Sequence, residues 1–256
     1  MDEVAATFER SVKSGQFRLG RTWPALLATG AVGGLDVGMG VLGLLLVEHF
    51  THSKLEGSIA FGIGFIALAL AGSELFTEDF LIPVAAVVAG KSNIRSLIRL
   101  WVGTLITNLL AGWLMMWIIT TGLPQLKPNA LVLGIHFVKQ GTTLQSFATA
   151  ILAGTIITVM TWMEASSRSI LARIIASVSA AFLLAMGSLN HAIVASLEIF
   201  ASLQFGAPFG YLSWLEVLGW AILGNMIGGI FFVTVLRLVQ VGSRKIEEEK
   251  EIMTQT

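Results

Sequence analysis

One histidine of the chain lies inside an apolar stretch, and it is the residue best placed to do chemistry near neutral pH. His191 follows the interruption at residues 186–190 (Met-Gly-Ser-Leu-Asn), whereas His49, His52 and His136 fall in or near loops. An imidazole with a pKa near 6.5 can hydrogen-bond a passing anion or lend it a proton. Ionisable groups at membrane depth usually face a cavity and act in function. A structural role is the alternative for His191.

A second polar interruption, residues 73–79 (Ser-Glu-Leu-Phe-Thr-Glu-Asp), breaks an earlier apolar stretch. The hydroxyl of Thr77 can donate a hydrogen bond to an anion without trapping it. It can also cap the helix that follows, as Asp79 can. Glu74 and Glu78 would repel an anion if they were unpaired. We therefore expect these two carboxylates to bind backbone N–H groups of the loop or charges at the interface.

Four further side chains are candidates for a pathway. Lys139 precedes the fourth apolar stretch and would raise the local anion concentration in an outer mouth, unless it is simply a solvated charge. Asp36 lies mid-span among glycines, where a pore role and an inter-subunit contact remain open. Phe61 and Phe65 are four residues apart on one helical face. They could form a hydrophobic constriction, with ordinary packing as the alternative.

The composition places these residues in a membrane protein. Of the 256 residues, 55% are hydrophobic and 12% are charged, against about 25% charged in soluble domains. The 27 glycines suit helices that approach closely in lipid. The formal net charge is zero, so no nucleic-acid partner is expected. There is no cysteine and no His/Glu spacing typical of a metal site, so neither a metal nor a cofactor is expected.

Six apolar stretches predict six passes of an all-α membrane bundle: residues 24–48, 57–90, 96–120, 143–163, 171–203 and 212–239. Four of them have the length of one span. The second and fifth are too long for one crossing and too short for two. Because each also contains a polar interruption, we interpret them as broken helices, each made of two half-helices joined at membrane depth.

The basic residues predict the orientation. With both termini in the cytoplasm, thirteen Lys and Arg residues lie inside and three (Lys54, Lys127 and Lys139) lie outside. This predicts a multi-pass protein of the cell (inner) membrane. Three regions follow: an amphipathic cytoplasmic helix at 1–22, the six-span domain at 23–240 and a cytoplasmic tail at 241–256. In the first region, Val4, Phe8 and Val12 recur every four residues, as in a helix lying on the inner membrane surface.

The two halves of the chain share a weak internal repeat. The Gly-Ser pairs at 72–73 and 187–188 are 115 residues apart, and Asn108 and Asn225 occupy related positions in the third and sixth stretches. Three spans per half would invert the second half in the membrane. Interrupted spans at matching positions of such a 3+3 inverted repeat point to a transport pathway at the midplane. Non-helical backbone survives there only when protein or water satisfies its polar groups.

Over residues 20–240, the chain resembles the formate/nitrite transporter family. The motifs that carry the resemblance are Glu-Leu-Phe-Thr at 74–77, Asn-His at 190–191, Gly-Asn-Met-Ile-Gly-Gly at 224–229, and Trp101 with Asn108. The spacing between Lys139 and the Ile-Leu-Ala at 151–153 also matches the family. The resemblance implies an aquaporin-like six-span fold, a homopentamer in lipid and one pore per protomer.

By position, the family resemblance implies site residues. His191 and Thr77 would form the central site, and Lys139 would stand in the outer vestibule. Leu75, Phe61, Phe65 and Leu184 would be constriction residues. Some positions depart from the family. Asn190 stands where formate channels have glutamate, and Ala195 and Gly154 stand where asparagine is common. These departures are typical of a divergent branch.

The expected function is a channel or transporter for small monovalent anions of weak acids, formate first, with a proton as a possible companion. Nitrite, hydrosulfide or another small monocarboxylate is the alternative. A neutral-solute pore of the water/glycerol type requires paired Asn-Pro-Ala boxes, which the sequence lacks. A membrane-embedded enzyme or sensor is disfavoured by the isolated histidine and the absence of cysteine.

Overall fold

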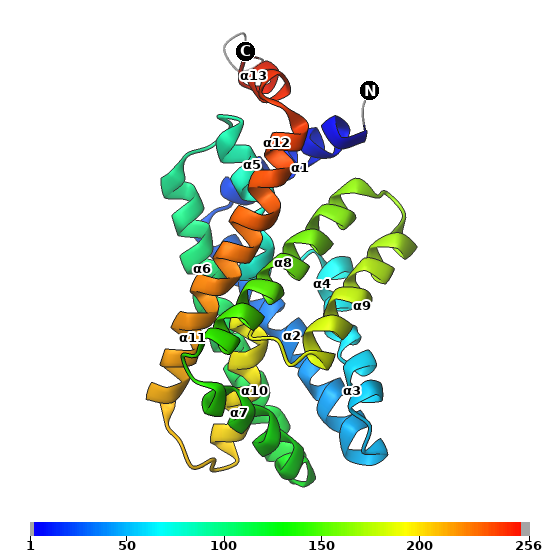
Figure 1. Ribbon diagram of the computed structural model, residues 1–256, viewed down its shortest axis with the longest axis vertical. Coiled ribbons are helices and arrows are strands. Elements are labelled where there is room, and N and C mark those ends of the chain that lie inside the picture. The colour runs from blue at the N-terminus through cyan, green and yellow to red at the C-terminus, as the bar shows by residue number, and fades with distance from the viewer. Residues whose placement is uncertain (1–2, 252–256) are drawn as a thin grey trace.

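The computed structural model describes residues 3–251, so residues 1–2 and 252–256 of the two predicted terminal segments lie outside it. All the regular elements of the described part are helices (Figure 1). The elements are α1 (Glu3–Leu19), α2 (Trp23–Thr51), α3 (Lys54–Ala60), α4 (Gly62–Ala71), η1 (Phe76–Phe80), α5 (Ile82–Val88), α6 (Ile94–Gly122), η2 (Pro124–Leu126), α7 (Lys127–Gln140), α8 (Leu144–Ser166), α9 (Ile170–Met186), α10 (Ala192–Gln204), α11 (Tyr211–Met226), η3 (Ile227–Val235), α12 (Leu236–Val241) and α13 (Ser243–Glu251).

Within the described residues, five helical segments are long and apolar enough to cross a membrane: Trp23–Thr51, Lys54–Ala71, Ile94–Gly122, Leu144–Ser166 and Tyr211–Val241. The remaining predicted pass is made of the two shorter apolar helices α9 and α10. In Figure 1 both termini lie at one end of the molecule, with α1 and α13, and α3 and α7 lie at the opposite end. We call these the terminal end and the far end.

Both predicted helix breaks are present. The first broken stretch, predicted at 57–90, stops at Ala71 and resumes as α5 at Ile82, with the short 3-10 helix η1 between them. The second stops at Met186 and resumes as α10 at Ala192. Gly72 ends α4 in the left-handed conformation, at φ 68°, which glycine adopts without steric cost. In the second break Ser188 takes the left-handed conformation instead, at φ 46°.

An asparagine holds each break closed. The side-chain amide of Asn108 on α6 donates to the carbonyls of Gly30 (2.6 Å) and Glu74 (2.9 Å), and its oxygen accepts from the N–H of Phe76 (2.9 Å). Asn108 and Asn225, the asparagine that holds the second break, are both fully buried. A broken helix exposes backbone groups that lipid cannot satisfy, and a primary amide can meet two acceptors and one donor at once.

Asn225 on α11 repeats this arrangement in the second half. Its amide donates to the carbonyls of Ala150 (2.8 Å) and Asn190 (3.0 Å), and its oxygen accepts from the N–H of Ala192 (2.9 Å). The partner helix approaches each asparagine at a glycine, Gly34 on α2 and Gly154 on α8, where a Cβ atom would meet asparagine backbone. The equal sets of bonds support the repeat; its inverted orientation stays a prediction.

The helix α1 packs against protein, which corrects the expectation that its apolar stripe lies on the membrane surface. Phe8 and Val12 are buried against Ala85 of α5 and Ala89, which caps that helix, with α12 and α13 alongside. At Gly15 the two helices approach so closely that a side chain would meet the backbone of α5. The stripe is therefore a helix-packing face, and α1 covers the second half-helix of the first break.

We predict that Asn225→Ala and Asn108→Ala will each destabilise the fold by about 3 kcal/mol, because each leaves buried backbone groups without partners at a typical cost of about 1–3 kcal/mol apiece. Thermal unfolding of the purified protein in detergent, followed by tryptophan fluorescence, measures the effect. Asn93→Ala is the matched control, because Asn93 is exposed and makes one capping bond to the N–H of Ser96. Equal shifts of the thermal midpoint in all three variants would contradict the conclusion that Asn108 and Asn225 hold the breaks closed.

Candidate functional site

The two predicted central residues meet where the two breaks face each other. The Thr77 Oγ1 and His191 Nε2 atoms are 2.7 Å apart, and both side chains are fully buried. Thr77 belongs to η1 in the first break, and His191 is the N-cap of α10 in the second. Residues 114 positions apart in the sequence thus form one hydrogen-bonded pair between the halves.

The second ring nitrogen of His191 fixes the direction of that bond. Nδ1 accepts a hydrogen bond from the backbone N–H of Val194 at 3.2 Å, which caps α10. In a neutral imidazole the other nitrogen then carries the proton, so Nε2–H donates to the Thr77 oxygen. This leaves the Thr77 hydroxyl hydrogen free for an anion. A second proton on His191 would break the cap, so this geometry favours the ring as a hydrogen-bond donor over the ring as a proton donor.

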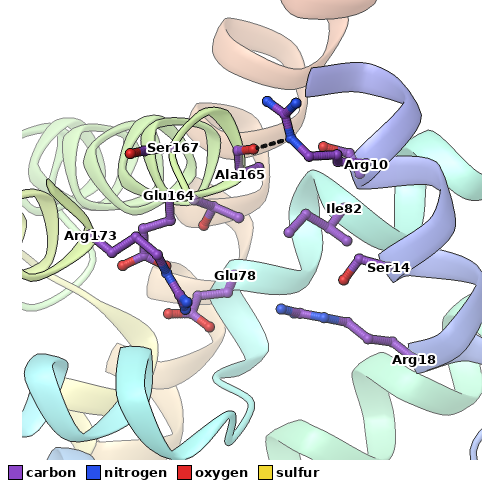
Figure 2. Close-up of a pocket in the computed structure, with 11 residues that line it drawn as sticks. Arg10, Ser14, Arg18, Glu78, Ile82, Glu164, Ala165, Ser167 and Arg173 are labelled. Carbon is purple, nitrogen blue, oxygen red and sulfur yellow. Dashed lines mark hydrogen bonds between the residues drawn. The ribbon is translucent and has the colours of Figure 1, made fainter. Parts of the chain in front are cut away.

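A cavity of about 270 Å³ opens at the terminal end, next to the first break. Figure 2 shows its charged lining: Arg18 extends from α1 toward Glu78, and Arg173 and Glu164 come from the opposite side. Glu164 accepts a hydrogen bond from Ser177 at 2.6 Å. The cavity therefore has both signs of charge, with Glu78 one residue from Thr77.

Two arginines of α1 and its C-terminal connection neutralise carboxylates of the first break. Arg18 pairs with Glu74 (Nε to Oε1, 3.2 Å) and Asp79 (Nη1 to Oδ1, 3.1 Å), and Arg21 pairs with Glu74. Burial opposes the charge on Arg18, but Glu74, Asp79 and Glu78 outweigh that effect and raise the pKa of its guanidinium. This confirms the prediction that Glu74 binds interface charges. The described structure gives Glu78 no ion pair within 4 Å.

A smaller cavity of about 10 Å³, enough for about one water molecule, lies at the far end. Three ionisable residues line it: Glu48 from the end of α2, Lys54 from the start of α3 and Glu198 from α10. Lys54 Nζ donates to Ser188 Oγ at 2.9 Å, so this lysine also holds the second break. Leu184 lies in the same lining.

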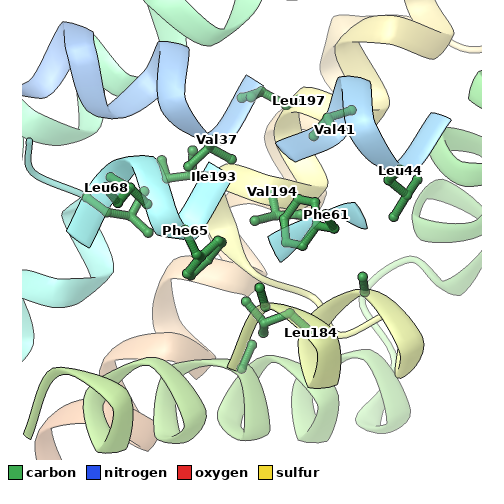
Figure 3. Close-up of a cluster of buried hydrophobic side chains, with 14 of the residues drawn as sticks. Val37, Val41, Leu44, Phe61, Phe65, Leu68, Leu184, Ile193, Val194 and Leu197 are labelled. Carbon is green, nitrogen blue, oxygen red and sulfur yellow. The ribbon is translucent and has the colours of Figure 1, made fainter. Parts of the chain in front are cut away.

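The predicted constriction residues lie in one hydrophobic cluster between the cavities. Phe61, Phe65, Leu75 and Leu184 are each 2% exposed or less and belong to the largest buried cluster. The rings of Phe61 and Phe65 are 5.5 Å apart at their centroids and tilted by 53°. Figure 3 shows Phe61 and Phe65 of the second pass facing Val194 of α10 and Leu184 of α9. Their role as a constriction stays a prediction.

Lys139 lines neither of the two charged cavities, and its place in an outer vestibule stays a prediction. Lys139 is exposed in the last turn of α7 and lines neither charged cavity. The reason is helical geometry: Phe137 is buried against α10, and a residue two positions later points about 200° away on a helix of 3.6 residues per turn. The cation of the far-end cavity is Lys54 instead.

Two other predicted residues have clear surroundings. Asp36 accepts a hydrogen bond from Ser73 Oγ at 2.5 Å, so it fastens the start of the first break to α2 and lines neither charged cavity. Asn190 is buried beside His191, and its carbonyl is held by Asn225. The side-chain oxygen of Asn190 has no hydrogen-bond partner among the described residues.

Sequence reasoning missed the charged linings. Arg10 and Arg18 of α1 meet Arg173 of α9 at the terminal end, and no local pattern connects these two distant segments. Glu198 had a usable signal, because it is an acidic residue within an apolar stretch, seven positions after His191. Two helical turns separate them, so both lie on one face of α10. Among the described residues, no three His, Asp or Glu side chains form a candidate metal site.

These features define a membrane transport protein in which two broken helices meet at a buried polar pair. The sequence model of the Formate/nitrite transporter family matches residues 5–239. The chain belongs to the formate/nitrite transporter family.

Relatives in Escherichia coli (strain K12) include the inner membrane protein YfdC and the formate channel FocA. YfdC is 29% identical, with 92% of this chain and 78% of YfdC aligned. FocA is 27% identical, with 70% of this chain and 71% of FocA aligned. Two solved structures share the fold. An FNT family ion channel has a TM-score of 0.85 at 17% identity, covering 91% of this chain and 98% of its own. A pentameric formate channel with formate bound has a TM-score of 0.72 at 20% identity, covering 85% and 96%.

We predict that Arg18→Gln will lower the thermal midpoint of the purified protein strongly, because it leaves two buried carboxylates short of a partner, a loss typically worth about 3–5 kcal/mol. Arg244→Gln is the control. Arg244 forms an ion pair with Glu248 at 3.1 Å, but its side chain is 94% exposed, so no measurable change is expected. Similar losses in both variants would show that the buried cluster does not hold α1 in place.

Proposed function

We propose that this protein conducts small monovalent anions of weak acids across the cell membrane, with formate as the first substrate and nitrite or hydrosulfide as alternatives. The observation that carries the proposal is the Thr77–His191 pair, a buried donor site between two charged cavities. A small anion needs such donors after it has lost its water in the surrounding hydrophobic cluster. The solved pentameric channel of this fold has formate bound, and FocA is a formate channel; both support this substrate class.

The bonding of the pair indicates how it acts. The Nδ1 bond from Val194 holds the imidazole ring, and Nε2–H occupies the Thr77 oxygen. The hydroxyl hydrogen of Thr77 is thereby aimed away from His191 and is free to bind a carboxylate oxygen. One neutral donor binds an anion weakly enough for release, which conduction requires. The pair binds the solute through hydrogen bonds alone, so we propose transport and no enzymatic activity.

The terminal end is proposed to face the cytoplasm. Lys54, Lys127 and Lys139, the three basic residues predicted outside, all lie on the far-end helices α3 and α7. The excess of Lys and Arg at the opposite end supports this orientation. Anions entering from outside would first meet the Glu48, Lys54 and Glu198 side chains, and anions leaving inside would pass Arg18 and Arg173.

We predict that Thr77→Val will reduce formate uptake roughly 10- to 100-fold, because a hydrogen bond to a charged group is worth about 1.5–3 kcal/mol. Stopped-flow light scattering of proteoliposomes measures uptake. Thr29→Val is the matched control, since the Thr29 hydroxyl bonds only the Ala25 carbonyl of its own helix, at 2.6 Å. Unchanged uptake in the Thr77 variant would refute the proposed site, and its effect on nitrite and hydrosulfide would rank the substrates.

We further propose a homopentamer with one pathway in each protomer, in keeping with the pentameric assembly of the solved formate channel. Native mass spectrometry of the protein released from detergent should give five times the 27.4 kDa chain mass. The exposed apolar side chains of α6, including Leu110, Leu114 and Ile118, leave ample surface for lipid or subunit contact. A monomeric mass in mild detergent and in nanodiscs would contradict the pentamer.

A further inference from the structure

Glu198 is a buried carboxyl group that the proposed central site does not use. Its side chain is 5% exposed, and the described residues give it no hydrogen bond or ion pair. It lines the far-end cavity together with Leu184 and Val194. An ionised carboxylate without a partner at this depth is costly and would repel an anion. A protonated carboxyl group is compatible with both the burial and an approaching anion.

Its position places it before His191 on the way from the far end. Glu198 follows His191 by two helical turns, and Val194 lies between them on the same face of α10. A solute that has passed the mouth at Lys54 therefore reaches the Glu198 carboxyl before the Thr77–His191 pair. His191 cannot supply a proton there, because its Nδ1 is occupied by the N–H of Val194.

Two charges face Glu198 from neighbouring elements, Glu48 of α2 and Lys54 of α3. The remaining titratable groups on the elements packed against α10 do not line the cavity: Asp36 and His49 of α2, Lys127, His136 and Lys139 of α7, Tyr211 and Glu216 of α11, and Arg95 and Arg99 of α6. Lys54 favours an ionised Glu198, and Glu48 opposes it. Burial favours the protonated carboxyl group of Glu198, and one cation and one anion at the cavity mouth adjust that preference.

We propose that Glu198 is the proton donor that converts the entering anion into its neutral acid. This inference rests on the proposed transport of weak-acid anions. The O–H bond of the Glu198 carboxyl breaks, and a new O–H bond forms on an oxygen of formate. Formic acid moves on toward Thr77, and the Glu198 carboxylate recovers a proton from hydronium or water at the far end. In the reverse direction, the acid returns its proton to Glu198.

The test measures formate and proton uptake together. Proteoliposomes that contain the full-length protein and trapped pyranine receive a formate pulse at external pH values from 5 to 8. Wild-type vesicles are expected to take up about one proton per formate. Glu198→Gln should lower formate uptake at pH 7 at least tenfold and abolish the coupled proton signal, while Glu198→Asp should keep the coupling. Glu56→Gln, the same change at an exposed residue of α3 outside the cavity, should behave as wild type.

The flanking charges give a second readout that does not require the Glu198 variant to fold. Lys54→Gln should move the midpoint of the pH profile of uptake to higher pH, and Glu48→Gln should move it to lower pH. Coupled, wild-type uptake by Glu198→Gln would overturn the inference. Faster uptake by that variant would also overturn it, because the carboxyl would then act only as a repulsive charge. Coincident pH profiles of uptake for Lys54→Gln and Glu48→Gln would also overturn the inference.

The same measurements separate this inference from the proposed function. Wild-type vesicles that transport formate while Glu198→Gln remains normal would leave the proposed function intact and remove the role of Glu198. Wild-type vesicles that take up none of formate, nitrite and hydrosulfide would overturn the proposed function and this inference with it.

Discussion

The fold depends on satisfying backbone groups where two helices stop inside the membrane. Lipid offers no hydrogen bonds, so every N–H and C=O freed by a break needs a protein partner. Asn108 and Asn225 each donate one hydrogen bond and accept one at the ends of their own break. Each asparagine also donates a hydrogen bond to a backbone carbonyl of a neighbouring helix, Gly30 of α2 or Ala150 of α8. The break, the helix that carries the asparagine and this neighbouring helix therefore form one rigid unit.

The two halves share this unit but differ in charge. The first break contains Glu74, Glu78 and Asp79, and the N-terminal segment supplies the arginines that pair with two of them. The second break contains only Asn190 and His191 at the equivalent depth, and it binds no arginine among the described residues. The N-terminal helix is therefore part of the first break's structure rather than an appendage. This explains why its apolar stripe packs on α5.

Much of this could be predicted from the sequence, because helix breaks and their partners leave local signals. The polar interruptions at 73–79 and 186–190 predicted both breaks, and the family resemblance implied that Thr77 and His191 share one central site. The helix α7 was not predicted, because residues 127–140 fall in what we interpreted as a loop between spans. The sequence did not show that Lys139 lies outside the far-end cavity, because distance along the sequence does not give the face of a helix. The position of Lys54 in the far-end cavity depends on the packing of α3 against α9, which is a tertiary contact.

The distribution of charge along the pathway limits what can pass. Ionisable groups line both cavities, whereas the cluster between them is hydrophobic apart from neutral side chains such as Thr77 and His191. A permanent ion would lose its hydration there and gain only a few hydrogen bonds, which do not offset the cost. An ion that can become neutral by accepting a proton avoids most of that cost. The structure therefore favours anions of weak acids over anions of strong acids of similar size, and it does so through desolvation, without needing a site shaped for one substrate.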